Sequence, residues 1–207
     1  MNTPPRPDDL PEIAPGPPLL LVLSGFSGAG KDSVRDLLMA WRLPVHFAVT
    51  ANTRPPRDGE VEGRDYRFVS DAEFDRLERD GELIEHAIVY GQRKGVPRDE
   101  VLAPLETGRD VLARVDVQGA FTLRQLVPDA VLIFIAPPSL EEAQRRLASR
   151  HTDTDEEQRL RVATAAAEME ASKSFDYIVV NETNGLDRAA RRVFEIMADE
   201  KKRRGAT

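Results

Sequence analysis

The chain alternates short apolar runs with longer segments in which apolar residues recur every three or four positions. Five segments have the length and composition of strands: 19–23, 47–50, 110–115, 131–136 and 177–180. After the first of them, apolar residues follow helical spacing from Val34 to Trp41. Strand and helix signals in alternation predict an α/β fold, in which helices cover the faces of a parallel sheet.

Residues 50–97 do not fit this alternation. They combine a loop rich in arginine and glycine, a helix over 71–80, a strand over 83–89 and a turn over 91–95. Ser70 and Glu73 form a capping box for that helix, and Pro97 is placed to begin the next one, which runs to about residue 107. We expect residues 48–96 to form an inserted, substrate-binding subdomain.

Prolines dominate residues 1–18, which predicts a flexible tail. The 207 residues suit one domain, and the formal net charge of -7 argues against nucleic-acid and acidic-membrane partners. There is no cysteine, and the three histidines lack the spacing of metal ligands. Without an apolar span or a secretory leader, the sequence predicts a soluble cytoplasmic protein, either a monomer or a homodimer.

The apolar run 19–23 leads into a glycine-rich turn with four residues between Gly25 and Gly30-Lys31. This is the P-loop pattern, in which backbone N–H groups and a helix N-terminus bind phosphate oxygens and the lysine adds a mobile cation. We therefore predict an ATP site. Its candidate residues are Gly25, Ser27, Gly28, Ala29, Gly30, Lys31, Asp32 and Ser33.

The residue after the P-loop lysine departs from the usual pattern. Ser or Thr normally stands there and reaches Mg²⁺, whereas this chain has Asp32 followed by Ser33. Asp32 could merely favour the helix N-terminus, where a carboxylate is stabilised. Alternatively, Asp32 helps to hold Mg²⁺ through water, or Ser33 contacts a phosphate. The sequence leaves these alternatives open.

Three further motifs follow in order: 53–66 (TRPPRDGEVEGRDY), 136–139 followed by 146–150, and 176–181. Together with the P-loop they resemble the guanylate kinase family of nucleoside monophosphate kinases over about residues 19–200. The resemblance implies a P-loop fold with a parallel five-stranded core sheet flanked by helices. It also implies a domain over 19–204, divided into a core (19–47, 97–136 and 175–204), the NMP-binding subdomain and a helical lid over about 137–174.

The resemblance further implies transfer of the γ-phosphoryl group of ATP to GMP with Mg²⁺ as cofactor. The residues that match the family's contacts to GMP are Thr50, Arg54, Arg57, Tyr66, Glu85, Lys94 and Asp116. The matching catalytic residues are Lys31, Arg146, Arg150 and Arg161. Asn181 matches a residue near the adenine, and the predicted metal residues, mostly acting through water, are Ser33, Asp32 and Asp116.

The chain departs from the family pattern mainly in the acceptor region. Lys94 and Val96 replace a tyrosine and a hydroxyl residue, Arg114 replaces a common acid, and His151 replaces a glycine. Losing the hydroxyl at Val96 weakens discrimination for guanine. Two alternatives follow: a related kinase with another acceptor, such as a ribose 1,5-bisphosphate phosphokinase, and a catalytically silent binding module.

Overall fold

The computed structural model describes residues 5–26, 28–89, 91–148 and 167–206. Its centre is a five-stranded sheet in the order β2-β7-β1-β8-β9. These strands are β1 (Leu20–Gly25), β2 (His46–Phe47), β7 (Val111–Arg114), β8 (Val131–Ala136) and β9 (Tyr177–Val180). All their pairings are parallel, which confirms the predicted core sheet.

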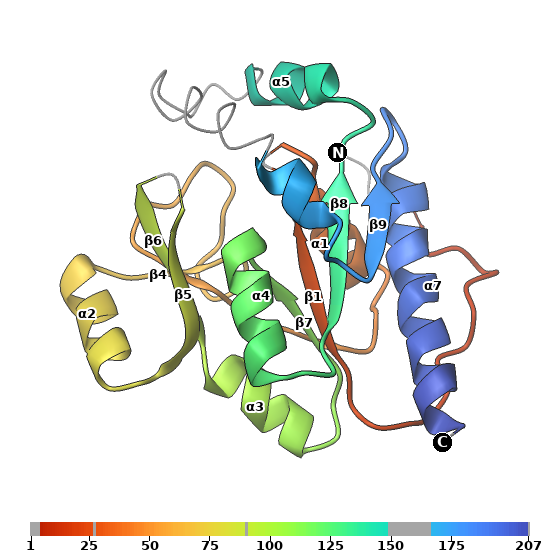
Figure 1. Ribbon diagram of the computed structural model, residues 1–207, viewed down its shortest axis with the longest axis horizontal. Coiled ribbons are helices and arrows are strands. Elements are labelled where there is room, and N and C mark those ends of the chain that lie inside the picture. The colour runs from red at the N-terminus through yellow and green to blue at the C-terminus, as the bar shows by residue number, and fades with distance from the viewer. Residues whose placement is uncertain (1–4, 27, 90, 149–166, 207) are drawn as a thin grey trace.

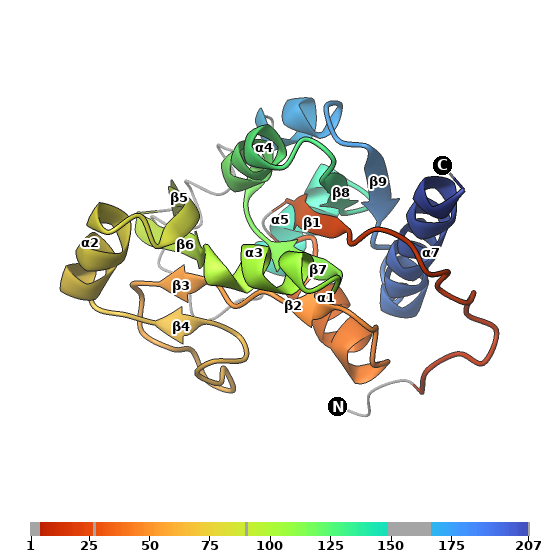
Figure 2. The ribbon, with the colours of Figure 1, turned by 90° about the horizontal axis from the view of Figure 1, so that it is seen from below.

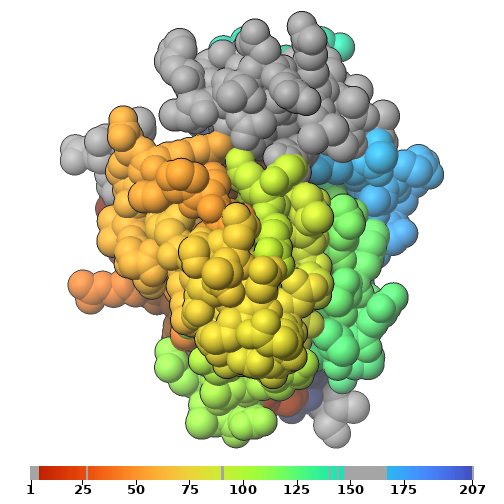
Figure 3. Space-filling model, turned by 90° about the vertical axis from the view of Figure 1, so that its left-hand side faces the viewer, coloured from red at the N-terminus to blue at the C-terminus, as the bar shows by residue number. Residues whose placement is uncertain are grey.

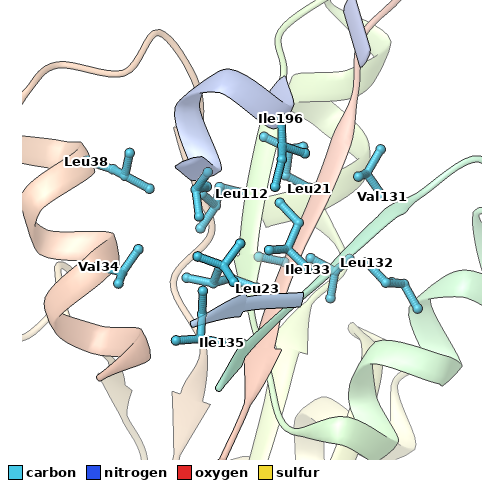
Figure 4. Packing of buried hydrophobic residues seen from close by; sticks show 14 of the residues in the cluster. Leu21, Leu23, Val34, Leu38, Leu112, Val131, Leu132, Ile133, Ile135 and Ile196 are labelled. Carbon is cyan, nitrogen blue, oxygen red and sulfur yellow. The ribbon is translucent and has the colours of Figure 1, made fainter. Parts of the chain in front are cut away.

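Helices cover both faces of this sheet (Figures 1 and 2). The helices α1 (Lys31–Ala40) and α7 (Leu186–Gly205) pack against each other on one face, and α4 (Val117–Leu126) lies on the other. Val34 and Leu38 of α1 project toward the sheet beside Leu112 (Figure 4). Because β1 and β8 are buried on both faces, they are continuous apolar runs rather than alternating ones.

Residues 51–97 form a second, four-stranded sheet in the order β4-β3-β6-β5. Its strands are β3 (Ala51–Asn52), β4 (Arg67–Phe68), β5 (Leu83–Val89) and β6 (Gln92–Pro97). The helix α2 (Asp71–Arg79) buries Phe74 and Leu77 against it and lies in yellow at the centre of the face in Figure 3. Ser70 accepts a hydrogen bond from the Glu73 amide, as the capping box predicts.

Two local predictions in this region are wrong. Residues 92–97 form a strand paired with β5 rather than a turn, and Gly91, whose left-handed backbone has φ 75°, lies where the chain reverses. Pro97 therefore ends β6, and the following helix α3 (Asp99–Glu106) begins two residues later. The helix α5 (Leu140–Ala148) is the described beginning of the segment predicted as a lid.

The proline-rich segment makes contacts along α7 and α1. Leu10 and Ile13 pack against the main core, and Asp9 accepts a hydrogen bond from Arg191 at 2.7 Å. The Arg6 guanidinium lies 5.6 Å from the centre of the Phe194 ring. The segment crosses α7 before it enters β1 (Figure 2). In the part of the chain that the structure describes, no helix combines the length and the apolar character that a membrane crossing requires.

Candidate active site

A cleft joins the end of β1 to the second sheet. The P-loop contributes Gly25, Gly28, Gly30, Lys31 and Asp32 to its lining. The second sheet and its loops contribute Thr50, Arg54, Arg57, Tyr66, Glu85 and Lys94, and Asp116 comes from the end of β7. The cleft thus brings together most of the residues predicted from the sequence, although they are distributed over nearly a hundred positions.

The P-loop glycines permit close approaches that a side chain would prevent. Gly25 has φ 135°, and a Cβ there would lie 2.1 Å from the Ile135 carbonyl oxygen on β8. Gly30 has φ 88°, and a Cβ there would lie 2.5 Å from the side-chain amide of Asn181. These positions therefore require glycine, both for the left-handed backbone and for the space.

The Lys31 ammonium group lies over the loop. It donates to the carbonyl oxygens of Gly25 at 2.5 Å and of Phe26 at 2.9 Å. On the outer side of the loop, the Asn181 amide donates to the Ala29 carbonyl at 2.7 Å. Arg146 of α5 in turn donates to the Asn181 carbonyl and to Glu142. Asn181 and Arg146 thus support the loop from outside the cleft lining.

The Tyr66 ring is the centre of a cationic cluster. Arg114, Arg54 and Lys94 lie 4.3, 5.1 and 5.9 Å from its centre. Such contacts use the negative face of the ring, and with Arg57 they gather four cationic side chains at this end of the cleft. Two of the four, Arg54 and Arg114, are paired with Glu60 and Asp32. Lys94, which replaces the tyrosine common in the family, therefore contributes charge to the same place.

Glu60 holds Arg54 by a bidentate ion pair, at 2.5 and 2.7 Å. The same carboxylate accepts a hydrogen bond from the Arg57 backbone amide. Desolvation opposes ionisation of Glu60, but the contact to Arg54 outweighs it and lowers the pKa of this carboxyl. Glu60 thereby fixes the orientation of the guanidinium fork beside Tyr66.

Glu85 is a buried acid, with 4% of the residue exposed. Burial, with a smaller contribution from the nearby Asp116 carboxylate, raises the pKa of Glu85 to about 8. Asp116 itself caps α4 by accepting a hydrogen bond from the Gly119 amide at 3.0 Å. Two acids from different sheets therefore face the cleft together, and Glu85 retains its proton at neutral pH.

Two of the departures from the family pattern contact each other. Arg114 of β7 donates to the Asp32 carboxylate on α1 at 2.5 Å. Desolvation disfavours the ionised form of Asp32, but Arg114 and Lys31 outweigh it and hold the pKa of the carboxyl well below its usual range. About half of the Asp32 side chain remains exposed to the cleft. Neither sequence-based alternative for Asp32 included this partner.

The other predicted residues lie as follows. Ser33 is exposed in the first turn of α1 and does not contribute to the described lining of the cleft. Ala29 is buried behind the loop. Ser27, Arg150 and Arg161, like His151, lie outside the described residues.

The sequence did not predict three residues that shape this site. Glu60 belongs to the motif 53–66, but its pairing with Arg54 requires the folded loop. Arg114 was noted only as a departure, although it lines the cleft. Glu168 also lines the cleft, and no local signal singled it out.

A parallel α/β sheet whose central strand enters a glycine-rich loop and a helix, with a cationic cleft beside it, defines a P-loop kinase. The guanylate kinase family model matches residues 18–200. The chain therefore belongs to the guanylate kinase family, as its motifs suggested.

Among its relatives, the guanylate kinase of Thermobifida fusca is 48% identical over 165 residues, which cover 80% of this chain and 84% of that protein. Guanylate kinase 2, chloroplastic/mitochondrial, of rice is 43% identical over 191 residues, covering 91% and 67%. The crystal structure of guanylate kinase from Anaplasma phagocytophilum superimposes with a TM-score of 0.76 at 35% identity, covering 90% of this chain and 88% of that one.

Proposed function

We propose that the protein transfers the γ-phosphoryl group of ATP to GMP, giving ADP and GDP. One observation carries this proposal. Lys31 of the P-loop, the cationic cluster around Tyr66 and the buried Glu85 all line the same cleft. Membership of the guanylate kinase family supports the same acceptor.

The donor end is the P-loop. Its backbone N–H groups and the N-terminus of α1 bind the phosphates of ATP. Lys31, which donates to two loop carbonyls at 2.5 and 2.9 Å, has a flexible stem that can turn toward the β- and γ-phosphates. The sequence predicts that Arg146, Arg150 and Arg161 supply cations to the transferred group, on which negative charge is spread in the transition state. Of these, Arg146 is described, and it pairs with Glu142 and the Asn181 carbonyl outside the cleft lining.

The acceptor end orients GMP. Arg54 and Arg57, with Lys94 beside Tyr66, bind the monophosphate, and Glu60 keeps the Arg54 fork aligned. Glu85 and Thr50 read the guanine. Glu85 releases its proton when GMP binds, and the ionised carboxylate accepts hydrogen bonds from the ring N1–H and the amino group. Adenine offers no such pair of donors. Discrimination follows because a buried acid left unpaired is costly.

The acids on the cleft fit Mg²⁺ bound together with ATP. Asp32 and Asp116 both line the cleft, and Mg²⁺ typically uses one or two carboxylates, several waters and the phosphates themselves. When bound, Mg²⁺ neutralises charge on the β- and γ-phosphates.

Two alternatives are less well supported. A kinase for another phosphorylated acceptor would suit Lys94 and Val96, but the motif 53–66 and the buried Glu85 favour a guanine. A silent binding module would not need Lys31 and Arg146, which the chain retains. A cytoplasmic location and a monomeric or dimeric state stay predictions, and the rice relative carries "chloroplastic/mitochondrial" in its name.

The test is transfer of radiolabelled γ-phosphate from Mg-ATP to GMP, with GDP resolved from ADP. The wild type should form labelled GDP, and Lys31→Met should lower the rate by about a hundredfold or more, since Lys31 supplies positive charge to the transferred phosphate. The exposed Lys202→Met is the control for loss of a lysine. Equal rates in wild type and Lys31→Met, with both proteins folded, would contradict the assigned role of the P-loop.

A further inference from the structure

Arg114 is a buried cation held on several sides. Only 6% of the residue is exposed. Its Nη1 donates to the Asp32 carboxylate at 2.5 Å and its Nη2 to the Asp65 carbonyl at 2.9 Å. Its guanidinium carbon lies 4.3 Å from the centre of the Tyr66 ring. No other cation in the described cluster approaches that ring as closely.

A buried guanidinium needs a counter-charge, because an unpaired one costs several kcal/mol. The Asp65 carboxylate is already engaged by Arg35, Arg64 and the Val61 amide, and it offers Arg114 only its backbone carbonyl. Asp32 is the acid whose carboxylate contacts Arg114. The acid at position 32 thus accounts for how a cation can be buried at position 114.

Three parts of the molecule meet at this guanidinium. Asp32 belongs to the helix that follows the P-loop, Arg114 ends the core strand β7, and Asp65 and Tyr66 belong to the loop of the acceptor region. The Asp32–Arg114 pair therefore connects the residues predicted to bind ATP with the tyrosine predicted to bind the acceptor phosphate.

We propose that Arg114 is a positioning residue for the acceptor phosphate, acting through Tyr66 and the Asp65 turn, and that Asp32 is its required counterion. This inference rests on the proposed function. In the family pattern, a hydroxyl residue stands at position 32 and an acid is common at position 114. The two departures contact each other directly, so they form one unit.

The test compares Arg114→Met, Asp32→Asn and the double variant in steady-state kinetics, calorimetric titration with GMP and thermal unfolding. Arg114→Met should raise KM for GMP about tenfold or more while KM for ATP changes by about twofold or less, since two of its three contacts, the Asp65 carbonyl and the Tyr66 ring, lie on the acceptor side. Asp32→Asn should also raise KM for GMP. The double variant should be no worse than the poorer single variant, because residues that act as a pair are not additive.

A second set of variants distinguishes a positioning role from simple loss of stability. Arg114→Glu alone places a second carboxylate beside that of Asp32, and the two repel each other. Adding Asp32→Ser removes this repulsion and should recover at least about tenfold in kcat/KM for GMP. The matched control is Lys201→Met. Lys201 is an equally buried cation that pairs with Asp110 at 3.0 Å outside the cleft lining, and its loss should lower the melting temperature without changing KM for GMP.

The results of these experiments distinguish a positioning role of Arg114 from a purely structural one. If Arg114→Met lowers the melting temperature as Lys201→Met does but keeps the wild-type KM for GMP, Arg114 is only structural. If the two single changes add in the double variant, Asp32 is not the counterion. If the wild type neither binds nor phosphorylates GMP, the proposed function fails and this inference fails with it, a result that is visible before any variant is made.

Discussion

The carboxylate of Glu85 occupies the space that a side chain on Gly119 would need. A Cβ atom on Gly119 would lie 2.5 Å from Oε2 of Glu85 and 3.0 Å from its Cδ. Glu85 belongs to β5 of the second sheet, whereas Gly119 lies in the first turn of α4 on the core sheet. Because Gly119 has no side chain, the Glu85 carboxylate of the second sheet can pack against α4 of the core, at the place proposed for the guanine.

Gly119→Ala should therefore displace Glu85 and impair GMP selection more than folding. Alanine is favoured over glycine within a helix by roughly 0.5–1 kcal/mol, which offsets part of the crowding. We expect KM for GMP to rise about tenfold, with KM for ATP nearly unchanged. Steady-state kinetics with each substrate varied measures both values. A Cβ atom on Gly119 would also lie 3.0 Å from Cβ of Val115, so in a Glu85→Ala background Gly119→Ala should lower the melting temperature but cause no further rise in KM for GMP. An unchanged KM in the single variant would contradict this account.

Binding of GMP should depend on pH through Glu85. The pKa of Glu85 is raised to about 8 in the free protein, so the carboxyl is protonated at pH 7, whereas the donors of guanine favour the ionised form. Binding then releases a proton. Affinity for GMP should rise between pH 6 and 8, by up to about tenfold per pH unit, and level off above pH 8.

Glu85→Gln is the control for this pH dependence, because GMP carries a phosphate that also ionises near pH 6. The variant keeps the phosphate effect and removes the carboxyl. Calorimetric titration in buffers of different ionisation enthalpy counts the released protons directly. Equal proton release in wild type and Glu85→Gln would mean that Glu85 does not titrate on binding.

The same pKa makes a prediction for stability. Since the folded protein keeps the Glu85 proton to about pH 8 while the unfolded chain loses it near pH 4.5, the folded state binds more protons in that window. Its free energy of unfolding should therefore fall as pH rises from 4.5 to 8. Urea unfolding across this range measures the slope, and Glu85→Gln should flatten it.

Removing residues 1–14 should destabilise the protein without changing its kinetics. Leu10 and Ile13 pack against the core, and partial burial of two such side chains contributes roughly 1–3 kcal/mol. The truncation retains Gly16 and Pro17, whose carbonyls accept hydrogen bonds from Lys201. A lower melting temperature with unchanged kcat and KM is expected. An unchanged melting temperature would show that the segment does not stabilise the fold.

Features that are local in sequence were predictable. The P-loop requires only glycines at fixed spacing between a strand and a helix. Strand β8 and the first four residues of β1 are recognisable because strands buried on both faces are continuous apolar runs. The acceptor residues came instead from the motif 53–66 and its family resemblance. Their gathering in one cleft agrees with that prediction, while their roles stay predictions.

Features that depend on distant contacts were not predictable. Asp32 and Arg114 are 82 positions apart. The sequence around either residue therefore gives no sign that the two form an ion pair. Leu10 and Ile13 stand singly among prolines and show no periodicity, so their packing is visible only when α1 and α7 are in place. Residues 92–97 carry a glycine at Gly95, which suggested a turn, but Gly95 leaves room for Leu83 across the strand pair.

The most direct test of the central claim is acceptor-dependent ADP formation from Mg-ATP with GMP, dGMP, AMP, UMP and ribose 1,5-bisphosphate supplied one at a time. We predict a strong response to GMP and at least about a hundredfold lower kcat/KM for AMP, because Glu85 would be left unpaired in its buried site. A preference for the ribose compound, or no response to any of the five, would contradict the assignment of GMP as the acceptor.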